Sequence, residues 1–199
     1  MRLKSRAMLA ATVVGLIGVS SPAGAHQELA RQSAAEIKPP FSGEANVNYA
    51  LGLWKKLAED RLVGPASIIT YPYEGTPPHG KVLEYLETEV TYQGHTGLVI
   101  VKKNYGGDAE PEELEHAVLE DRLGHLGAVT VMFRREDGYD PDHQNWFWAK
   151  YKPDGSLDTN PKGMKLAGRV AKGKDMGCIA CHQGADGGDY IFAHDKFAE

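Results

Sequence analysis

The chain has 199 residues, of which 42% are hydrophobic and 25% charged, and its formal net charge is −5 at pH 7. This composition excludes a disordered chain, a collagen-like repeat and a disulfide-rich scaffold, and the length suits one domain with a hydrophobic core. The chain contains only 2 cysteines, which can form at most one disulfide between them.

The first 25 residues have the pattern of an export signal. A basic start and an apolar run over residues 7–19 are followed by Ala23-Gly24-Ala25. An A-x-A sequence after a short apolar run is typical of a cleaved signal peptide, and the run is too short to span a bilayer comfortably. We therefore expect residues 1–25 to be removed, residues 26–199 to form a single domain, and the protein to be periplasmic. The alternative is an uncleaved N-terminal anchor.

Removal of this segment makes the protein more acidic. The segment holds three basic and no acidic residues, so the remainder carries 19 basic and 27 acidic side chains, a formal charge of −8. Phosphate backbones and anionic lipid surfaces are poor partners for such a protein, and no cluster of lysine and arginine interleaved with aromatics offsets this charge. We expect no nucleic-acid partner and no membrane partner.

The next element is an amphipathic helix over residues 44–62, where apolar residues recur every three or four positions and Gly64-Pro65 follows as a stop. Beyond it the pattern becomes β-prone, in runs separated by Gly, Pro, Asn and Asp. These runs are residues 81–92, 97–103, 128–134 and 145–152. Their proximity in the chain favours an antiparallel sheet.

A second helical segment is predicted between the second and third β-prone runs. It begins at Pro111, ends at Gly124, and places Leu114, Ala117, Val118 and Leu123 on one face. Residues 153–177 are rich in Gly, Lys and Asp and are expected to be loop, with solvated basic side chains. The fold class expected is α+β, an antiparallel β-sheet with flanking helices.

Both cysteines lie in Cys178-Ile179-Ala180-Cys181-His182. This C-x-x-C-H pattern is the c-type haem attachment motif. The two thiols can add to the two vinyl groups of one haem, and the adjacent imidazole is then held beneath the iron. We therefore predict one covalently attached haem c at the C-terminal end of the fold, anchored by Cys178 and Cys181, with His182 as the proximal ligand of the iron.

Other uses of the two cysteines fit the sequence less well. A thioredoxin-like pair would open a helix after the first strand of a βαβ unit, whereas this motif lies near the C-terminus. A structural zinc site needs about four Cys and His ligands. A disulfide across two intervening residues is strained and leaves His182 without a role.

The function of a haem depends on the second face of the iron. A second strong ligand makes an electron carrier, while an open position admits small molecules. Met132 and Met164 are each a candidate ligand or a core residue, and His79 and His143 follow prolines and are expected to be solvated loop residues. The residues by themselves do not distinguish an electron-carrying haem from a haem with an open position.

In its ordered set of motifs the chain resembles the cytochrome P460 and cytochrome c′-β family, from the first helix onward. The segments that carry the resemblance are residues 97–105 (GLVIVKKNY), 129–133 (VTVMF), 138–140 (GYD), 145–151 (NWFWAKY), 177–182 (GCIACH) and 189–192 (DYIF). The resemblance implies an antiparallel sheet with helices, usually a homodimer, and a five-coordinate c-type haem whose open face binds nitric oxide or hydroxylamine.

The resemblance also draws attention to Lys102. P460 proteins have a lysine linked to the porphyrin and oxidise hydroxylamine, whereas c′-β proteins lack the link and bind gases. GLVIVK matches the lysine-bearing strand and places Lys102 at that position. Strand alternation puts Leu98, Ile100 and Lys102 on one face, where a desolvated amine could act as a nucleophile. The alternative is a strand-end lysine that pairs with a carboxylate or reaches water.

Two groups of residues after the third β-prone run could border the same site. Glu136, Asp137, Asp140 and Asp142 are candidate proton acceptors or a solvated turn, and Trp146, Phe147 and Trp148 could wall a haem pocket or fill a core.

The sequence therefore predicts a periplasmic monohaem c-type cytochrome with an open iron site for small nitrogen oxides. If Lys102 is linked to the haem, we expect hydroxylamine oxidation towards nitric oxide or nitrous oxide, with electrons passed to a soluble acceptor. The alternatives are nitric oxide binding without turnover and a six-coordinate electron-transfer cytochrome.

Overall fold

The computed structural model describes residues 40–197 and contains one six-stranded sheet in which neighbours in sequence are neighbours in space. The predicted signal peptide, residues 1–25, lies outside the described residues. The strands are β1 (Tyr73–Glu74), β2 (Val82–Tyr92), β3 (His95–Tyr105), β4 (Leu126–Arg134), β5 (Trp146–Tyr151) and β6 (Ala167–Gly168). The helices are α2 (Glu44–Glu59), α3 (Pro111–Glu120), α4 (Arg122–His125), α5 (Cys178–His182) and α6 (Phe192–Phe197), with 3-10 turns η1 (Pro141–His143) and η2 (Asp186–Gly188).

Every strand pair in the described sheet is antiparallel, so the predicted α+β class and antiparallel sheet with flanking helices are confirmed. The hairpin between β2 and β3 turns through Gln93 and Gly94, which have φ values of 51° and 81°. Two consecutive left-handed residues match the right-handed twist of the strands that they join. Tyr92 and His95 are thereby paired, and this pairing sets the register of β2 against β3.

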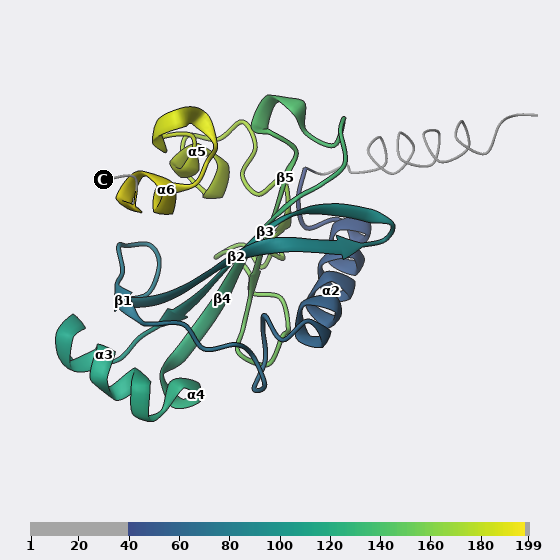
Figure 1. Ribbon diagram of the computed structural model, residues 1–199. Helices are drawn as coiled ribbons and strands as arrows, with labels where there is room; N and C mark the ends of the chain where they lie inside the picture. Colours follow the sequence, from purple (N-terminus) through teal and green to yellow (C-terminus); the bar gives the residue numbers. More distant parts are fainter. Residues whose placement is uncertain (1–39, 198–199) are drawn as a thin grey trace, which may run out of the picture.

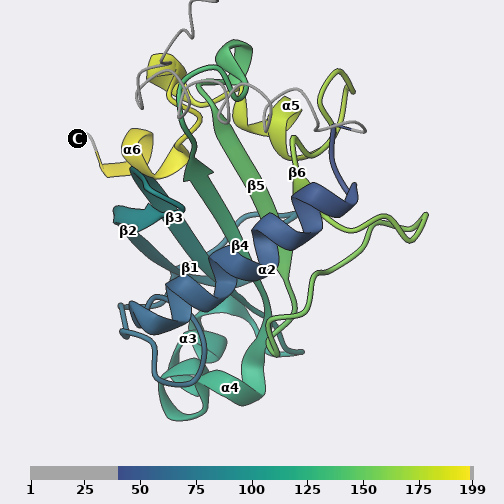
Figure 2. The ribbon, with the colours of Figure 1, turned by 90° about the vertical axis from the view of Figure 1, so that its right-hand side faces the viewer.

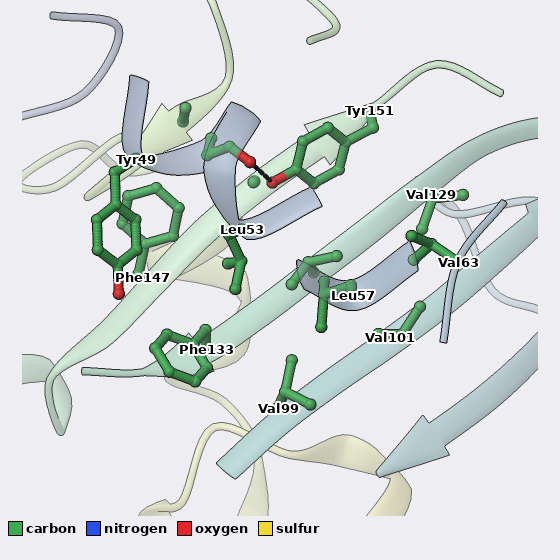
Figure 3. Packing of buried hydrophobic residues seen from close by; sticks show 14 of the residues in the cluster. Tyr49, Leu53, Leu57, Val63, Val99, Val101, Val129, Phe133, Phe147 and Tyr151 are labelled. Carbon is green, nitrogen blue, oxygen red and sulfur yellow. Dashed lines mark hydrogen bonds between the residues drawn. The ribbon is translucent and has the colours of Figure 1, made fainter. Parts of the chain in front are cut away.

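Helix α2 covers one face of the sheet, as Figures 1 and 2 show. Its buried residues, among them Leu53 and Leu57, recur at helical spacing and pack on the side chains of the central strands, which Figure 3 shows from close by. The Tyr151 hydroxyl of β5 donates a hydrogen bond of 2.8 Å to the Ala50 carbonyl of α2. These contacts form the larger hydrophobic core.

The opposite face of the sheet carries the C-terminal segment. Helices α5 and α6 lie at one end of the molecule, away from α3 and α4 (Figures 1 and 2). A second apolar cluster joins this face to them and includes Ile100, Met132, Trp146, Trp148, Ile179, Tyr190 and Ile191. The sheet therefore separates a helix-covered core from the face that receives the C-x-x-C-H segment.

Two boundaries differ from the sequence predictions. Helix α2 ends at Glu59, before the predicted end at residue 62. The second helix is divided at Asp121, whose carboxylate accepts a hydrogen bond of 2.9 Å from the Gly124 N–H and starts a new turn. Leu114 and Val118 are buried against β2 and β3, but Leu123 is 59% exposed, so its assignment to the same buried face was wrong.

Among the described residues, no helix has the length and apolar character that crossing a membrane requires.

We predict that Leu53→Ala in α2 lowers the free energy of unfolding by about 2–5 kcal/mol, because it leaves a cavity between the helix and the sheet. Leu51→Ala is the matched control, since Leu51 lies on the same helix and is 39% exposed; it should cost less than about 1 kcal/mol. Urea denaturation measures both, and equal losses would contradict the packing described.

Candidate functional site

The Cys178–His182 segment forms the short helix α5 on the second face of the sheet. Gly177 enters it with φ 125°, and a Cβ there would lie 2.3 Å from the Ala171 Cβ, so only glycine fits. Cys178 and Cys181, one helical turn apart, are both free thiols. Cys178 is partly buried, and this burial raises its pKa to about 11, whereas Cys181 is exposed. The pair is free to react with a group that lies over this end of the sheet.

His182 is held in one orientation by its backbone partner. Its side chain is buried, and Nδ1 lies 2.7 Å from the Tyr190 carbonyl oxygen. A carbonyl only accepts, so Nδ1 carries the hydrogen and Nε2 keeps its lone pair. Burial lowers the pKa of His182 to about 4, and the nearby Lys102 charge lowers it further. A neutral imidazole whose other nitrogen donates to a carbonyl is the usual form of a metal-binding histidine.

Tyr190 supplies that carbonyl from an unusual backbone position. Its φ is 71°, a left-handed conformation that residues other than glycine rarely adopt. Its ring is buried near the rings of Trp148 and His143, at centroid distances of 6.4 and 6.2 Å. The surrounding packing therefore fixes the carbonyl that orients His182.

Lys102 lies on the same face of the sheet as this histidine. It shares that face with Leu98 and Ile100, as strand alternation predicts, and it is 8% exposed. Within residues 40–197 its ammonium has no hydrogen bond or ion pair, and burial lowers its pKa. The amine is therefore desolvated without compensation from a carboxylate.

Lys103 points to the opposite face and is fully engaged there. Its Nζ donates to Ile68 O at 2.7 Å and to Glu84 Oε2 at 3.1 Å. Glu84 is completely buried and also accepts from Arg122 at 2.6 Å and from Tyr105 at 3.0 Å. This ion-pair network fixes which of the two adjacent lysines faces α2 and which faces α5.

The aromatic run of β5 is divided between the two faces. Phe147 belongs to the core under α2, while Trp146 and Trp148 pack with the C-terminal segment. The Trp148 ring lies 4.9 Å from the His182 ring, and its buried Nε1 has no hydrogen-bond partner among the described residues. An unpaired N–H in an apolar wall is a donor available to a bound group.

The expectation that His79 is solvated was wrong. Its ring is half-buried, Nδ1 lies 3.0 Å from Asn104 Oδ1, and its centroid is 6.1 Å from that of His182. The sequence shows only a histidine after two prolines in a turn. Its position next to His182 arises because the loop between β1 and β2 folds back over the end of β3.

His143 and Lys172, also expected to be solvated, both bind a buried carboxylate. His143 Nδ1 lies 2.9 Å from Asp140 Oδ2, and the Lys172 ammonium contacts Asp140 Oδ1. Asp140 is buried, whereas Asp142 is exposed and Glu136 pairs with Arg135 at 2.6 Å. These contacts indicate that Asp140 anchors the loop before β5.

These residues fit a haem. His182 offers a free Nε2, two unpaired thiols precede it, and the sheet beneath them presents an apolar wall with one unsatisfied donor, Trp148 Nε1. Among the described residues, no group of three or more His, Cys, Asp or Glu side chains could hold a metal ion. The arrangement is that of a sheet-based haem protein rather than a helical cytochrome.

The sequence profile of the family Cytochrome P460 matches residues 81–193, which is more than half of the chain. The chain therefore belongs to the cytochrome P460 family, and the family implies a haem cofactor with its iron. The matched segment contains Lys102, both cysteines, His182 and the strands β2 to β6. Comparison with curated proteins and with solved structures gave no match.

We predict that Glu84→Gln lowers the free energy of unfolding by about 3 kcal/mol or more at pH 7, because Lys103 and Arg122 lose a buried counter-charge. The Arg122 hydrogen bond and the Lys103 charge hold the pKa of Glu84 below its ordinary value despite burial. The stabilisation is therefore present above the unfolded pKa of about 4.3 and is lost as the pH falls through the lower folded pKa.

Denaturation at pH 7 and at pH 3 measures this difference. Glu89→Gln on the same strand is the matched control, because Glu89 is exposed. A gap between wild type and Glu84→Gln that does not shrink at the lower pH would contradict the role of the charge.

Proposed function

We propose that this protein is a periplasmic monohaem c-type cytochrome that oxidises hydroxylamine on a haem linked to Lys102. The proposal places thioether bonds at Cys178 and Cys181 and the proximal iron ligand at His182. The observation that carries it is the Lys102 amine, buried without a charge partner on the face that holds His182. A solvated or ion-paired lysine would have no such reactivity.

Haem attachment in this proposal consumes no oxidant. Each thiol S–H adds across one vinyl double bond, so the sulfur binds carbon and the hydrogen moves to the neighbouring carbon. Helix α5 spaces the thiols by one turn, and the hydrogen bond from His182 Nδ1 to the Tyr190 carbonyl directs Nε2 away from the backbone.

The link to Lys102 is an oxidation. An N–H bond of the amine and a C–H bond of the porphyrin edge are replaced by an N–C bond, and a peroxide accepts the electron pair and both protons to become water. The lowered pKa of Lys102 increases the fraction of neutral amine, the form with a nucleophilic lone pair. Lys103 is excluded because its ammonium binds Glu84 on the other face.

When bound, the haem supplies an iron that coordinates the nitrogen of hydroxylamine and accepts its electrons, which a soluble acceptor then removes. The chain itself contributes a site from which water is excluded. Ile100, Trp148 and Ile191 form an apolar wall on this face, and Lys102 is buried on the same face. Water exclusion strengthens the electrostatic interactions of a bound polar ligand.

Nitric oxide binding without turnover is the second candidate. The apolar character of the same wall favours it, because a small and weakly polar ligand needs no charged partner. The Lys102 link distinguishes the two, since it belongs to the oxidising branch of the family.

Export and dimer formation are part of the proposal. Residues 1–25 provide the export signal, and a homodimer would cover exposed apolar side chains such as Ile69 and Leu123, which border one cavity beside Lys103.

The decisive measurement is the intact mass and the ferrous absorption spectrum of the exported protein, followed by peptide mapping. We expect a mass increase of one haem and a haem peptide that contains Cys178 and Cys181. Absence of covalent haem would overturn the proposal.

We predict that Lys102→Arg removes the red shift of the Soret band and the haem-linked Lys102 peptide, and lowers hydroxylamine turnover at least about tenfold. Lys103→Arg is the matched control, because it keeps the charge beside Glu84 and should leave the spectrum unchanged. A wild-type protein with thioether-bound haem and no Lys102 link would favour nitric oxide binding instead.

A further inference from the structure

His194 of helix α6 connects the C-terminal segment to the sheet. Its Nδ1 lies 2.5 Å from Asp189 Oδ2, and its Nε2 lies 3.0 Å from Glu87 Oε2 and 3.1 Å from Glu87 Oε1. Asp189 lies in the turn before α6, whereas Glu87 belongs to β2, which Figure 2 shows next to α6. One imidazole therefore joins two carboxylates from distant parts of the chain, and we call these three side chains the His194 clamp.

The contacts of the clamp determine the protonation of its imidazole. A carboxylate oxygen only accepts, so each ring nitrogen carries a hydrogen and His194 is a cation when both contacts are made. The hydrogen bond with Asp189, and after it the contact with Glu87, raises the pKa of His194 above its ordinary value. When the ring loses a proton, one nitrogen presents a lone pair to a carboxylate, and that contact is lost.

The described groups that face His194 from neighbouring elements are acidic or neutral. Asp189 faces it from the preceding turn and Glu87 from β2, and the Tyr85 hydroxyl of β2 donates to the same Glu87 carboxylate. On its own helix, Asp195 accepts a hydrogen bond of 3.0 Å from a backbone N–H of the turn before α6. The proton on His194 is therefore held by two carboxylates.

Glu87 brings the clamp to the face of the sheet that carries Lys102. It is paired directly with Ile100 of β3, which shares that face with Lys102. Directly paired residues of antiparallel strands project to the same face. The bond between Glu87 and His194 therefore fastens α6 to the face on which the candidate haem site lies.

On its other side the clamp holds the backbone that orients His182. Asp189 Oδ1 accepts a hydrogen bond of 2.8 Å from the Ile191 N–H, and the Asp189 carbonyl accepts one of 3.1 Å from Trp146 Nε1. Tyr190, between Asp189 and Ile191, has a φ of 71° and presents its carbonyl oxygen to His182 Nδ1 at 2.7 Å. A left-handed conformation of a residue other than glycine persists only where the surrounding structure fixes it. The contacts of Asp189 are part of what fixes it here.

We propose that His194 is a positioning residue for the proximal haem ligand and that it acts only in its protonated form. As a cation it binds Asp189 to the sheet and so keeps the neighbouring Tyr190 carbonyl in place. That carbonyl in turn accepts the Nδ1 hydrogen of His182. The inference rests on the proposed function for the haem and for His182.

The raised pKa of His194 gives the direction of the pH dependence. Its folded pKa lies above the unfolded value of about 6.5, so the clamp is fully formed below that pH and is lost as the pH rises through the folded pKa. A hydrogen bond from the second nitrogen raises the basicity of a metal-bound imidazole. His182 should therefore bind iron more strongly below the pKa of His194 than above it.

The test is the iron–histidine stretching frequency of the full-length ferrous holoprotein, followed by resonance Raman spectroscopy from about pH 5 to about pH 9. Wild type should show a higher frequency at low pH than at high pH, with a midpoint above about 6.5. His194→Ala should give the low frequency at every pH. His194→Arg keeps the charge and two donors and should give the high frequency at every pH. His116→Ala on α3, an exposed histidine, is the matched control and should retain the wild-type curve.

Glu87→Gln keeps the inference testable where the alanine variant attaches no haem. Its neutral amide removes one of the two charges that hold the proton on His194, so the midpoint should move to lower pH. Glu89→Gln on the same strand is the matched control, because Glu89 is exposed and its loss changes only the surface charge. The midpoint of this control should equal that of wild type.

The outcomes separate this inference from the proposed function. A covalent haem whose iron–histidine frequency does not change with pH would overturn the role of His194 and leave the function standing. A pH dependence that survives in His194→Ala would also overturn it, since the titration would then belong to another group. A protein that attaches no haem would overturn both.

Discussion

The buried ion pair between Lys103 and Glu84 is the constraint on which the rest of the site depends. Two lysines are adjacent in β3, and a shift of one residue would exchange their faces. Glu84 is fully buried and holds Lys103, Arg122 and the Tyr105 hydroxyl under the α2 side of the sheet. An uncompensated carboxylate there would be costly, so the pair selects one register. Lys102 is left on the opposite face, without a counter-charge and close to His182.

On the face that carries Lys102 and His182, the structure disfavours positive charge on the side-chain nitrogens and leaves their lone pairs available. Burial lowers the pKa of Lys102, His79 and His182. The charge of Lys102 further lowers the pKa of both histidines. Backbone and amide oxygens, from Tyr190 and Asn104, fix the hydrogens of both imidazoles. The result is a neutral His182 imidazole beside an apolar wall, which suits an iron porphyrin better than a polar substrate.

The two histidines on this face are held in different ways. His182 follows directly on the two cysteines in α5, and the Tyr190 carbonyl that orients it is fixed by packing. His79 is carried by a loop, and the contact of its ring with the sheet is the one with the Asn104 amide oxygen. A side chain on a loop with few contacts is released at a lower free energy than one fixed in a packed core.

The sequence by itself determined the local features: the antiparallel strands, the amphipathic α2, the haem motif at Cys178, Cys181 and His182, and the face of β3 shared by Leu98, Ile100 and Lys102. Alternation and motif spacing are properties of short segments, so they can be read without knowing the fold. The family resemblance that they carried is confirmed by the match over residues 81–193. Only the tertiary structure decided the hydrogen-bond partners of His79, His143 and Lys172. It also decided that Leu123 is exposed, and that Phe147 and Trp148 belong to different hydrophobic clusters. These features depend on contacts between residues far apart in the chain, such as His79 with Asn104 and Asp140 with Lys172. Such contacts are set by the packing of the whole fold, and a local sequence pattern does not determine them.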